Sequence, residues 1–507
     1  MDLLYGGHIF ESALFLFLLL LLLSFCAYCC YVKYIHIKYD HIPGPPRDSF
    51  LFGHIKSINK YLNGPGLSHD KLLEWAEQYG PIYRLNALHR VILYAISPEA
   101  VQKYMMSSEY PKDPYVYNLL FSLFGVRFMG KGLITDPDHT HWYKQRRIMD
   151  PAFGHSYLKE MMGIFNEKAE YLMQKLEENA DGKTEVEMHA MINRVTLDVI
   201  AKVAFGMDLH LLDNKQSPFP HAISAVLKGM VPHVQNPYMQ YMPQHRKFVK
   251  DVQESAKLLR RTGRECIERR KEAVRNGEDV PKDILTQILK SAEQEGGYDD
   301  EIMLDNFITF FIAGQETTAN QISFTIMELT RQPEITAKLR DEIDDVVGSK
   351  RDVSFDDLGK LQYMTQVLKE SLRLYPPAPG TARLLTHDDV IEGIRIPGGV
   401  ALNFNTYIMG RMDKFFKAPL TFDPERFSPD APKPNFCYFP FTLGPRTCLG
   451  QVFSQMEAKV VLAKLLQRFN FKLAPGQSFE IKDTGTLRPR DGVICTLTLL
   501  TNKTKES

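Results

Sequence analysis

Cysteine is scarce in this chain of 507 residues, and neither sign of charge is in excess. The seven cysteines lack the spacing of a disulfide framework. Lysine plus arginine and aspartate plus glutamate both number 61, so the formal net charge is zero. This balance argues against nucleic acid as the main partner, because such binders usually carry a basic excess. The few cysteines favour a reducing compartment.

Internal repeats, low-complexity tracts and a Gly-x-Gly-x-x-Gly dinucleotide motif are also missing from the sequence. The chain therefore shows no nicotinamide or flavin site of its own. Its length allows a very large core, and 44% apolar and 24% charged residues are typical of a globular protein. No obvious linker divides the body, which predicts one large domain.

One long uncharged run lies near the start, between Glu11 and Lys33. About 21 residues at ~1.5 Å each match a hydrocarbon core of roughly 30 Å. A cleaved signal peptide has a charged first region and a small-residue cleavage site, so the run predicts a retained single-span anchor within residues 1–40. Lys33 and Lys38 follow the run and no lysine or arginine precedes it. The positive-inside rule then places the rest of the chain in the cytosol, and we expect an endoplasmic reticulum membrane.

The sequence after this run predicts a mainly helical body with small β-sheets. Pro43-Gly44-Pro45-Pro46 forms a stiff break, so we expect a second region over residues 41–507. Helical periodicity is found in six long segments, at 72–79, 157–180, 189–205, 249–276, 301–331 and 361–374. Short strand-like runs are found at 82–85, 91–95, 390–396 and 493–499.

The strongest chemical signal is the run from Phe441 to Gly450, Phe-Thr-Leu-Gly-Pro-Arg-Thr-Cys-Leu-Gly. Its glycines allow the backbone to approach a flat ligand, and Arg446 offers a fixed positive charge to an anionic group. A helix predicted over 451–469 begins just after Cys448, and we expect its first amides to lower the pKa of the thiol. The thiolate is the form that binds iron. The simpler interpretation is a structural cysteine in a loop.

This run matches the haem-binding signature Phe-x-x-Gly-x-Arg-x-Cys-x-Gly at every defining position. The chain therefore resembles the cytochrome P-450 superfamily of haem-thiolate monooxygenases. The resemblance implies the cytochrome P-450 fold. It also implies a haem b whose iron is bound by the thiolate of Cys448. It also implies electrons from NADPH, delivered by a flavoprotein reductase. Lys144 and Arg147 could dock that reductase, or could simply be solvated surface residues.

A second motif is Ala313-Gly314-Gln315-Glu316-Thr317-Thr318, in the middle of the helix predicted over 301–331. Gly314 is expected to open a space on one helix face. Alone, the polar residues would more often form a solvated face. The resemblance implies instead that Thr317 is the oxygen-activating hydroxyl and Glu316 the acid of a proton relay.

Three arginines and a tryptophan are candidates for the haem propionates. Trp142 and Arg146 lie one turn apart and place an indole N–H and a guanidinium together, both suitable donors. The resemblance adds Arg383 and Arg446 as further propionate partners.

Glu370 and Arg373 share one helix face, so the simplest interpretation is a surface ion pair. The resemblance implies a buried pair completed by Arg426, with the structural role of locking the loop that carries Cys448.

Several runs outside the haem signature, among them 165–170, 283–289 and 409–413, resemble the cholesterol 24-hydroxylase family. That resemblance implies hydroxylation of a sterol, cholesterol at side-chain carbon 24. Gln315 and Pro379 depart from that family's pattern. A broader lipid or xenobiotic hydroxylase is the main alternative. A haem-thiolate isomerase or dehydratase without O₂ chemistry, and a non-catalytic haem or sterol sensor, are two others.

An aromatic set in the segment 110–128 could either line a large apolar substrate pocket or belong to the plain core. The set consists of Tyr115, Tyr117, Phe121, Phe124 and Phe128.

Overall fold

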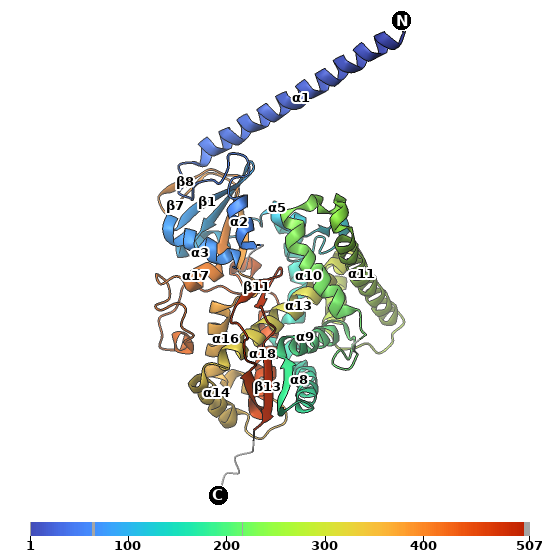
Figure 1. The fold of residues 1–507 in the computed structure, drawn as a ribbon. Coiled ribbons are helices and arrows are strands. Elements are labelled where there is room, and N and C mark those ends of the chain that lie inside the picture. The colour runs from blue at the N-terminus through green and yellow to red at the C-terminus, as the bar shows by residue number, and fades with distance from the viewer. Residues whose placement is uncertain (1, 63–65, 215, 501–507) are drawn as a thin grey trace.

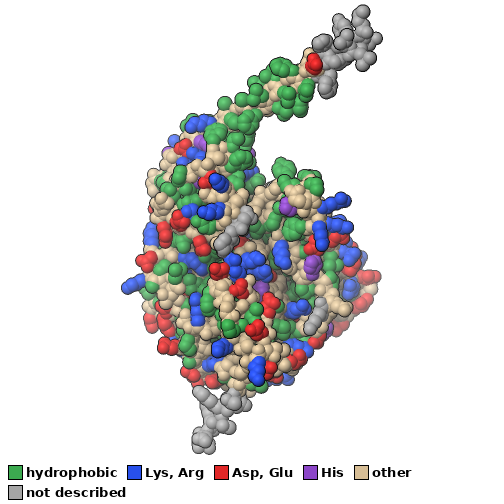
Figure 2. All heavy atoms as spheres, viewed as in Figure 1, with side chains coloured by type: hydrophobic (Ala, Val, Ile, Leu, Met, Phe, Trp, Pro, Cys, Tyr) green, Lys and Arg blue, Asp and Glu red, His purple; other side chains and the backbone are tan. Residues whose placement is uncertain are grey.

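A long helix projects from the body of the protein in the computed structural model, which describes residues 2–62, 66–214 and 216–500 (Figure 1). This helix, α1 (Asp2–Tyr39), contains a stretch, Glu11–Tyr39, that is long and apolar enough to cross a membrane. Leu14 and the apolar residues up to Leu23 are exposed, and Figure 2 shows α1 as a rod covered by apolar side chains. Lipid is the surrounding that suits such a surface, and the predicted N-terminal helix is confirmed.

The last turns of α1 pack on the body rather than projecting from it. Val32 and His36 are buried, and the hydroxyl of Tyr28 hydrogen-bonds to Nδ1 of His89 over 3.2 Å. The helix ends at Tyr39, four residues before the proline-rich break that begins at Pro43. The anchor is thus continuous with a docked helical segment.

A lobe rich in β-structure lies at the base of α1 (Figure 1). Its main sheet has the order β1-β2-β9-β6, in which β2 and β9 are parallel and the other pairs antiparallel. The strands of this lobe are β1 (Ile82–Ala87), β2 (Arg90–Ala95), β6 (Gly380–Leu385), β7 (Asp389–Ile391), β8 (Ile394–Ile396) and β9 (Val400–Asn405). Its helices are α2 (Ile55–Leu62), α3 (Ser68–Tyr79), α4 (Pro98–Met106) and α17 (Thr406–Arg411).

The larger part of the body is helical and is organised around α13 (Asp300–Leu329). Asp299 caps this helix by accepting hydrogen bonds from the N–H groups of Glu301 and Ile302. Helix α13 is buried around most of its circumference, and its buried positions include polar as well as apolar residues. It packs against α9 (Met188–Phe205), α16 (Gln362–Leu374) and α18 (Gln451–Arg468).

The remaining helices surround these four. They are α5 (Pro114–Leu119), α6 (His139–Met149), α7 (His155–Glu160), α8 (Met162–Glu177), α10 (Phe219–Gln235), α11 (Arg246–Arg275), α12 (Ile284–Gln294), α14 (Pro333–Val346) and α15 (Phe355–Lys360). Short 3-10 helices are η1 (Asp150–Phe153), η2 (Pro237–Tyr241), η3 (Pro243–His245), η4 (Pro424–Phe427) and η5 (Gly444–Arg446).

The small sheets outside the β-rich lobe are antiparallel. Three strands have the order β10-β13-β5, and β3 pairs with β4 and β11 with β12. Their bounds are β3 (Ser122–Leu123), β4 (Val126–Arg127), β5 (Asp181–Glu187), β10 (Phe469–Leu473), β11 (Ile481–Asp483), β12 (Leu487–Pro489) and β13 (Ile494–Leu499). The predicted class, mainly α with small β-sheets, is confirmed.

Two expected elements differ in detail. The helix predicted over 157–180 is divided into α7 and α8 at Met161, although its apolar periodicity continues across the break. The strand predicted over 390–396 is the hairpin β7–β8. Glu392 and Gly393 both adopt positive φ there, which forms the tight two-residue turn that closes a hairpin.

Candidate active site

The loop that carries Cys448 lies between η5 and α18 and is shaped by its own backbone. The N–H of Cys448 donates to the carbonyl of Phe441 over 2.9 Å. Gly444 has a φ of 70°, and a Cβ added there would lie 2.2 Å from the carbonyl oxygen of Met105 in α4. Only glycine permits this close approach without displacing the backbone. The loop is therefore held against the end of α4.

The thiol of Cys448 lines an internal space. The residue is exposed by area, yet burial raises the pKa of its thiol. The backbone N–H of Gly450 and the charges of Arg146 and Lys112 lower that pKa, but they do not outweigh burial. The predicted lowering of the pKa by a backbone amide is therefore present at Gly450, although burial outweighs it. A thiol that is enclosed by protein and still accessible faces a hollow, as a metal ligand must.

Two guanidinium groups, that of the buried Arg383 and that of the half-buried Arg446, have unused donors. Arg383 in β6 is 1% exposed and donates to Oγ1 of Thr381 over 3.1 Å, but its Nε and Nη2 have no partner among the described residues. Arg446 donates to the carbonyl of Asp136 over 2.9 Å, and its Nη2 is likewise unpaired within that part of the chain. Burial and the nearby Arg383 lower the pKa of Arg446 to about 10.

Lys112 is a third cation at this place, and the sequence analysis missed it. Its Nζ donates to the carbonyl of Ile134 over 2.7 Å. Burial, Arg383 and Arg446 lower its pKa well below the usual value, and Cys448 raises it. A lysine between two prolines belongs to no periodic pattern, so the only available signal was its place inside the segment 110–128 that carries the aromatic set.

These residues fit a haem. Lys112 and Arg383 are buried, Arg446 is half-buried, and all three retain unused N–H donors. Such a group of cations calls for an anion, and two propionate carboxylates would supply the charge and the acceptors. The accessible thiol of Cys448 offers the soft ligand that haem iron accepts.

Trp142 and Arg146, both on α6, support the same region from a neighbouring helix. The guanidinium of Arg446 lies over the indole of Trp142, 4.0 Å from the ring centroid. Nη1 of Arg146 donates to the carbonyl of Thr447 over 2.7 Å, directly before Cys448. Arg146 thus holds the cysteine loop, in addition to any contact that it makes with a propionate.

Helix α13 shows one accessible place along its buried length. From Ile302 to Leu329 every residue is buried except Ala313, Gly314 and Thr317, which are half-buried. These positions lie within one turn of each other on one face, so the middle of α13 has an accessible face there. The hydroxyl of Thr317 donates to the carbonyl of Ala313 over 2.8 Å. Its oxygen remains free to accept a further hydrogen bond.

The space expected from the missing side chain of Gly314 is already filled. A Cβ at Gly314 would lie 2.8 Å from the side chain of Ile200 in α9. The glycine therefore permits close packing of α9 on α13, and the accessible surface there comes from its backbone and from its neighbours.

Glu316 lies on a different face of α13 from Thr317. Its carboxylate accepts a hydrogen bond from Oγ1 of Thr486 over 3.3 Å. Burial raises the pKa of Glu316, and the charge of Arg488 lowers it. The residue borders a polar pocket of about 230 Å³. A carboxyl with a raised pKa beside a polar pocket is suited to exchange protons.

Gln315 lines the same pocket. Its amide nitrogen donates to the side chain of Asn193, while its buried Oε1 has no partner in the described part of the chain. The position at which the chain departs from the cholesterol 24-hydroxylase pattern thus faces this polar pocket.

The pair Glu370–Arg373 is fully buried, as the resemblance implied. Nη2 of Arg373 lies 2.7 Å from Oε1 of Glu370, and Arg426 joins the same oxygen with its Nε at 3.3 Å. Arg373 also donates to the carbonyl groups of Pro419 and Thr421. The cluster therefore fastens α16 to the segment that leads to the cysteine loop.

The aromatic set divides between core and surface. Phe124 and Phe128 are buried in the main hydrophobic cluster, which favours the core interpretation for them. Tyr115 is 39% exposed and stacks on the guanidinium of Arg90. The hydroxyl of Tyr117 hydrogen-bonds to Oγ1 of Thr381 over 3.0 Å, beside Arg383.

The sequence between residues 43 and 496 matches the family model Cytochrome P450. This chain belongs to the cytochrome P450 family. Relatives include cytochrome P450 4d2 of Drosophila melanogaster, 28% identical over 84% of this chain and 88% of the relative. Cytochrome P450 4B1 of Rattus norvegicus is 29% identical over 86% of each chain. Protein LUTEIN DEFICIENT 5, chloroplastic, of Arabidopsis thaliana is 31% identical over 83% of this chain and 72% of the relative.

This P450 is a haem-dependent monooxygenase whose iron is bound through a cysteine thiolate, as predicted, and whose electrons come from NADPH through a reductase. Cys448 is the cysteine of its haem signature. Its substrate is lipophilic. Lys144 and Arg147 on α6 are exposed, and their contact with the reductase remains a prediction. Arg147 also forms an ion pair with Glu295 at 3.0 Å.

Proposed function

We propose that this P450 hydroxylates a sterol, with cholesterol at side-chain carbon 24 as the first candidate. The runs at 165–170, 283–289 and 409–413 support this substrate by their resemblance to the cholesterol 24-hydroxylase family. The observation that carries the hydroxylase chemistry is the accessible face of Ala313, Gly314 and Thr317 in an otherwise buried helix. A membrane anchor suits a substrate that dissolves in lipid.

A broader lipid or xenobiotic hydroxylase is the second candidate. Gln315 faces a polar pocket, and Pro379 precedes β6, the strand that carries Arg383. Both positions depart from the sterol pattern at elements that border the site, and the relatives at 28–31% identity do not single out a sterol.

Each residue of the site has a proposed role. The haem, when bound, supplies the activation of O₂. Cys448 is the ligand of its iron, and Arg383, Arg446, Lys112, Trp142 and Arg146 hold the propionate side and the cysteine loop. Thr317 places a hydroxyl where oxygen is activated. Glu316 passes protons inward from the polar pocket.

The proposed arrangement in the cell follows from the anchor. Residues 1–40 form a single-pass anchor in the endoplasmic reticulum membrane, and residues 41–507 form the catalytic domain on the cytosolic side. Lys33 and Lys38, which follow the apolar run, support this orientation.

A product assay tests the proposal. The purified full chain is combined with a P450 reductase, NADPH and cholesterol, and the products are identified by mass spectrometry. A single 24-hydroxysterol that requires NADPH and reductase supports the sterol assignment. Turnover of other lipids or drugs, with none of cholesterol, transfers the assignment to the second candidate.

A further inference from the structure

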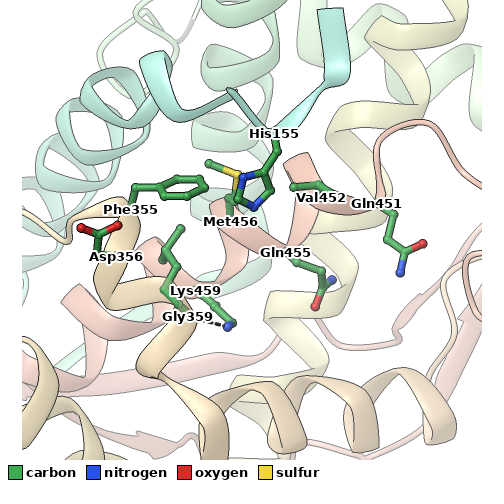
Figure 3. A pocket seen from close by; sticks show the side chains of 10 residues that line it. His155, Phe355, Asp356, Gly359, Gln451, Val452, Gln455, Met456 and Lys459 are labelled. Carbon is green, nitrogen blue, oxygen red and sulfur yellow. Dashed lines mark hydrogen bonds between the residues drawn. The ribbon is translucent and has the colours of Figure 1, made fainter. Parts of the chain in front are cut away.

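A groove of about 470 Å³ lies between α18 and α15, and none of the residues proposed to hold the haem lines it (Figure 3). Val452, Gln455, Met456 and Lys459 border it from α18, at the spacing of one helix face. Phe355, Leu358 and Gly359 border it from α15, and His155 completes one end. This volume is typical of small-molecule sites, which span roughly 300–1,000 Å³.

The middle of the groove is apolar. Phe355 packs edge-on against His155 with ring centroids 4.6 Å apart. On the opposite side Val452 is 39% exposed and presents apolar surface to the groove. A Cβ added to Gly359 meets no atom within 4 Å, so the space beside it is open.

Lys459 supplies a charge without a counter-ion. Its Nζ donates to the carbonyl of Leu358 over 2.6 Å, which uses one of three donors. No carboxylate in the described ranges lies within ion-pair distance of it. Burial lowers the pKa of Lys459 to about 8, which leaves the ammonium mostly charged at neutral pH.

Of the nearby acids, Glu342 raises the pKa of Lys459 through its charge but makes no ion pair with it. Both carboxylate oxygens of Glu342 accept backbone N–H groups, from Tyr363 over 2.6 Å and from Met364 over 2.8 Å. Asp356 borders the groove but is exposed to solvent. A partly buried ammonium facing an open apolar groove is thus complementary to an anion with an apolar body.

We propose that this groove binds a fatty carboxylate, whose carboxylate pairs with Lys459 and whose alkyl chain lies along Phe355, Leu358, Val452 and Met456. The site is separate from the haem hollow and does not depend on the identity of the sterol or other substrate. Because Val452 is four residues after Cys448, a bound chain also rests on the first turn of the helix that follows the cysteine loop.

Hydrogen–deuterium exchange of the full haem-loaded protein tests this site with decanoate as the probe. An azole bound to the haem iron blocks the active site, so that decanoate cannot act as a substrate there. The expected result is dose-dependent protection of amides in α15 and the first turns of α18. Decanol, which has the same chain and no charge, should protect at least tenfold less well at equal concentration.

Three variants locate the effect. Lys459→Met removes the charge at similar length and should weaken decanoate binding at least tenfold, about 1.4 kcal/mol. Gly359→Leu fills the groove and should abolish protection. Gly163→Leu in α8, where a Cβ also meets open space, is the matched control and should bind normally. Variants are compared after their haem spectra show that they are folded.

Either of two results overturns the proposal. The first is that millimolar decanoate gives no protection of the amides of α15 and α18 in the azole-bound protein. The second is that these amides are protected equally in the parent chain, in Lys459→Met and in Gly359→Leu, which would place the binding elsewhere.

Discussion

Lys112 and Arg383 are buried beside the half-buried Arg446, and such a group of like charges is costly unless an anion accompanies it. We therefore expect Lys112→Met to weaken haem retention. A charge-assisted hydrogen bond contributes about 1.5–3 kcal/mol, so haem should transfer to an acceptor apoprotein at least about tenfold faster. Absorbance of the acceptor measures the rate. Lys144→Met, an exposed position on α6, is the control, and equal rates for both variants would refute the role of Lys112.

Thr317 is the hydroxyl on the one accessible face of α13. We expect Thr317→Val to keep consuming NADPH while less of it forms hydroxylated product and more forms peroxide. The ratio of product to NADPH is the measurement. Thr317→Ser, which restores the hydroxyl, should recover most of that ratio. An unchanged ratio of product to NADPH in the valine variant would show that this hydroxyl does not take part in proton delivery.

At the scale of elements, the buried cluster of Glu370, Arg373 and Arg426 fastens α16 to the segment before the cysteine loop. Removing one partner of a buried ion pair leaves an uncompensated charge, at a cost of about 3–5 kcal/mol. Glu370→Ala should therefore lower both the melting temperature and the haem content per protein. Arg426→Met should cost less, because the Arg426 side chain retains 14% exposure. A glutamate variant as stable as the parent would contradict this account.

The sequence predicted most long elements because their burial follows a simple period. The segments at 189–205, 249–276 and 361–374 correspond closely to α9, α11 and α16. It did not predict α10, which contains Pro232 inside the helix, or the division of α7 from α8. These features depend on tertiary packing, which overrides local propensity.

The sequence offered candidate site residues where a motif had a fixed spacing, as at Cys448, Arg446 and Thr317. Their roles remain predictions. Lys112 was missed because its role depends on proximity to Arg383 and Arg446, which lie more than 250 residues away in sequence. The sequence analysis also did not place Glu316 and Thr317 on different faces of the helix, although consecutive helical residues point in different directions.

At the scale of the whole molecule, α1 combines an apolar rod, which we propose as the membrane anchor, with a base that packs on the body. Removing residues 2–27 should release the protein from membranes with little change in melting temperature. Removing residues 2–39 also deletes Val32, His36 and Tyr39, which are buried, so the melting temperature should fall. Burying one large apolar side chain contributes about 1.5–3 kcal/mol. Equal melting temperatures for the two truncations would show that the base of α1 is not docked.

The monooxygenase chemistry of this protein depends on Cys448 as the thiolate ligand of a haem. Its most direct measurement is the absorption spectrum of the reduced, carbon monoxide-bound protein, compared with that of Cys448→His. The parent chain should show the strongly red-shifted Soret band of thiolate-ligated haem, and the variant should lose it while keeping bound haem. A red-shifted band that persists in the variant, or one that the parent chain never shows, would contradict the assignment.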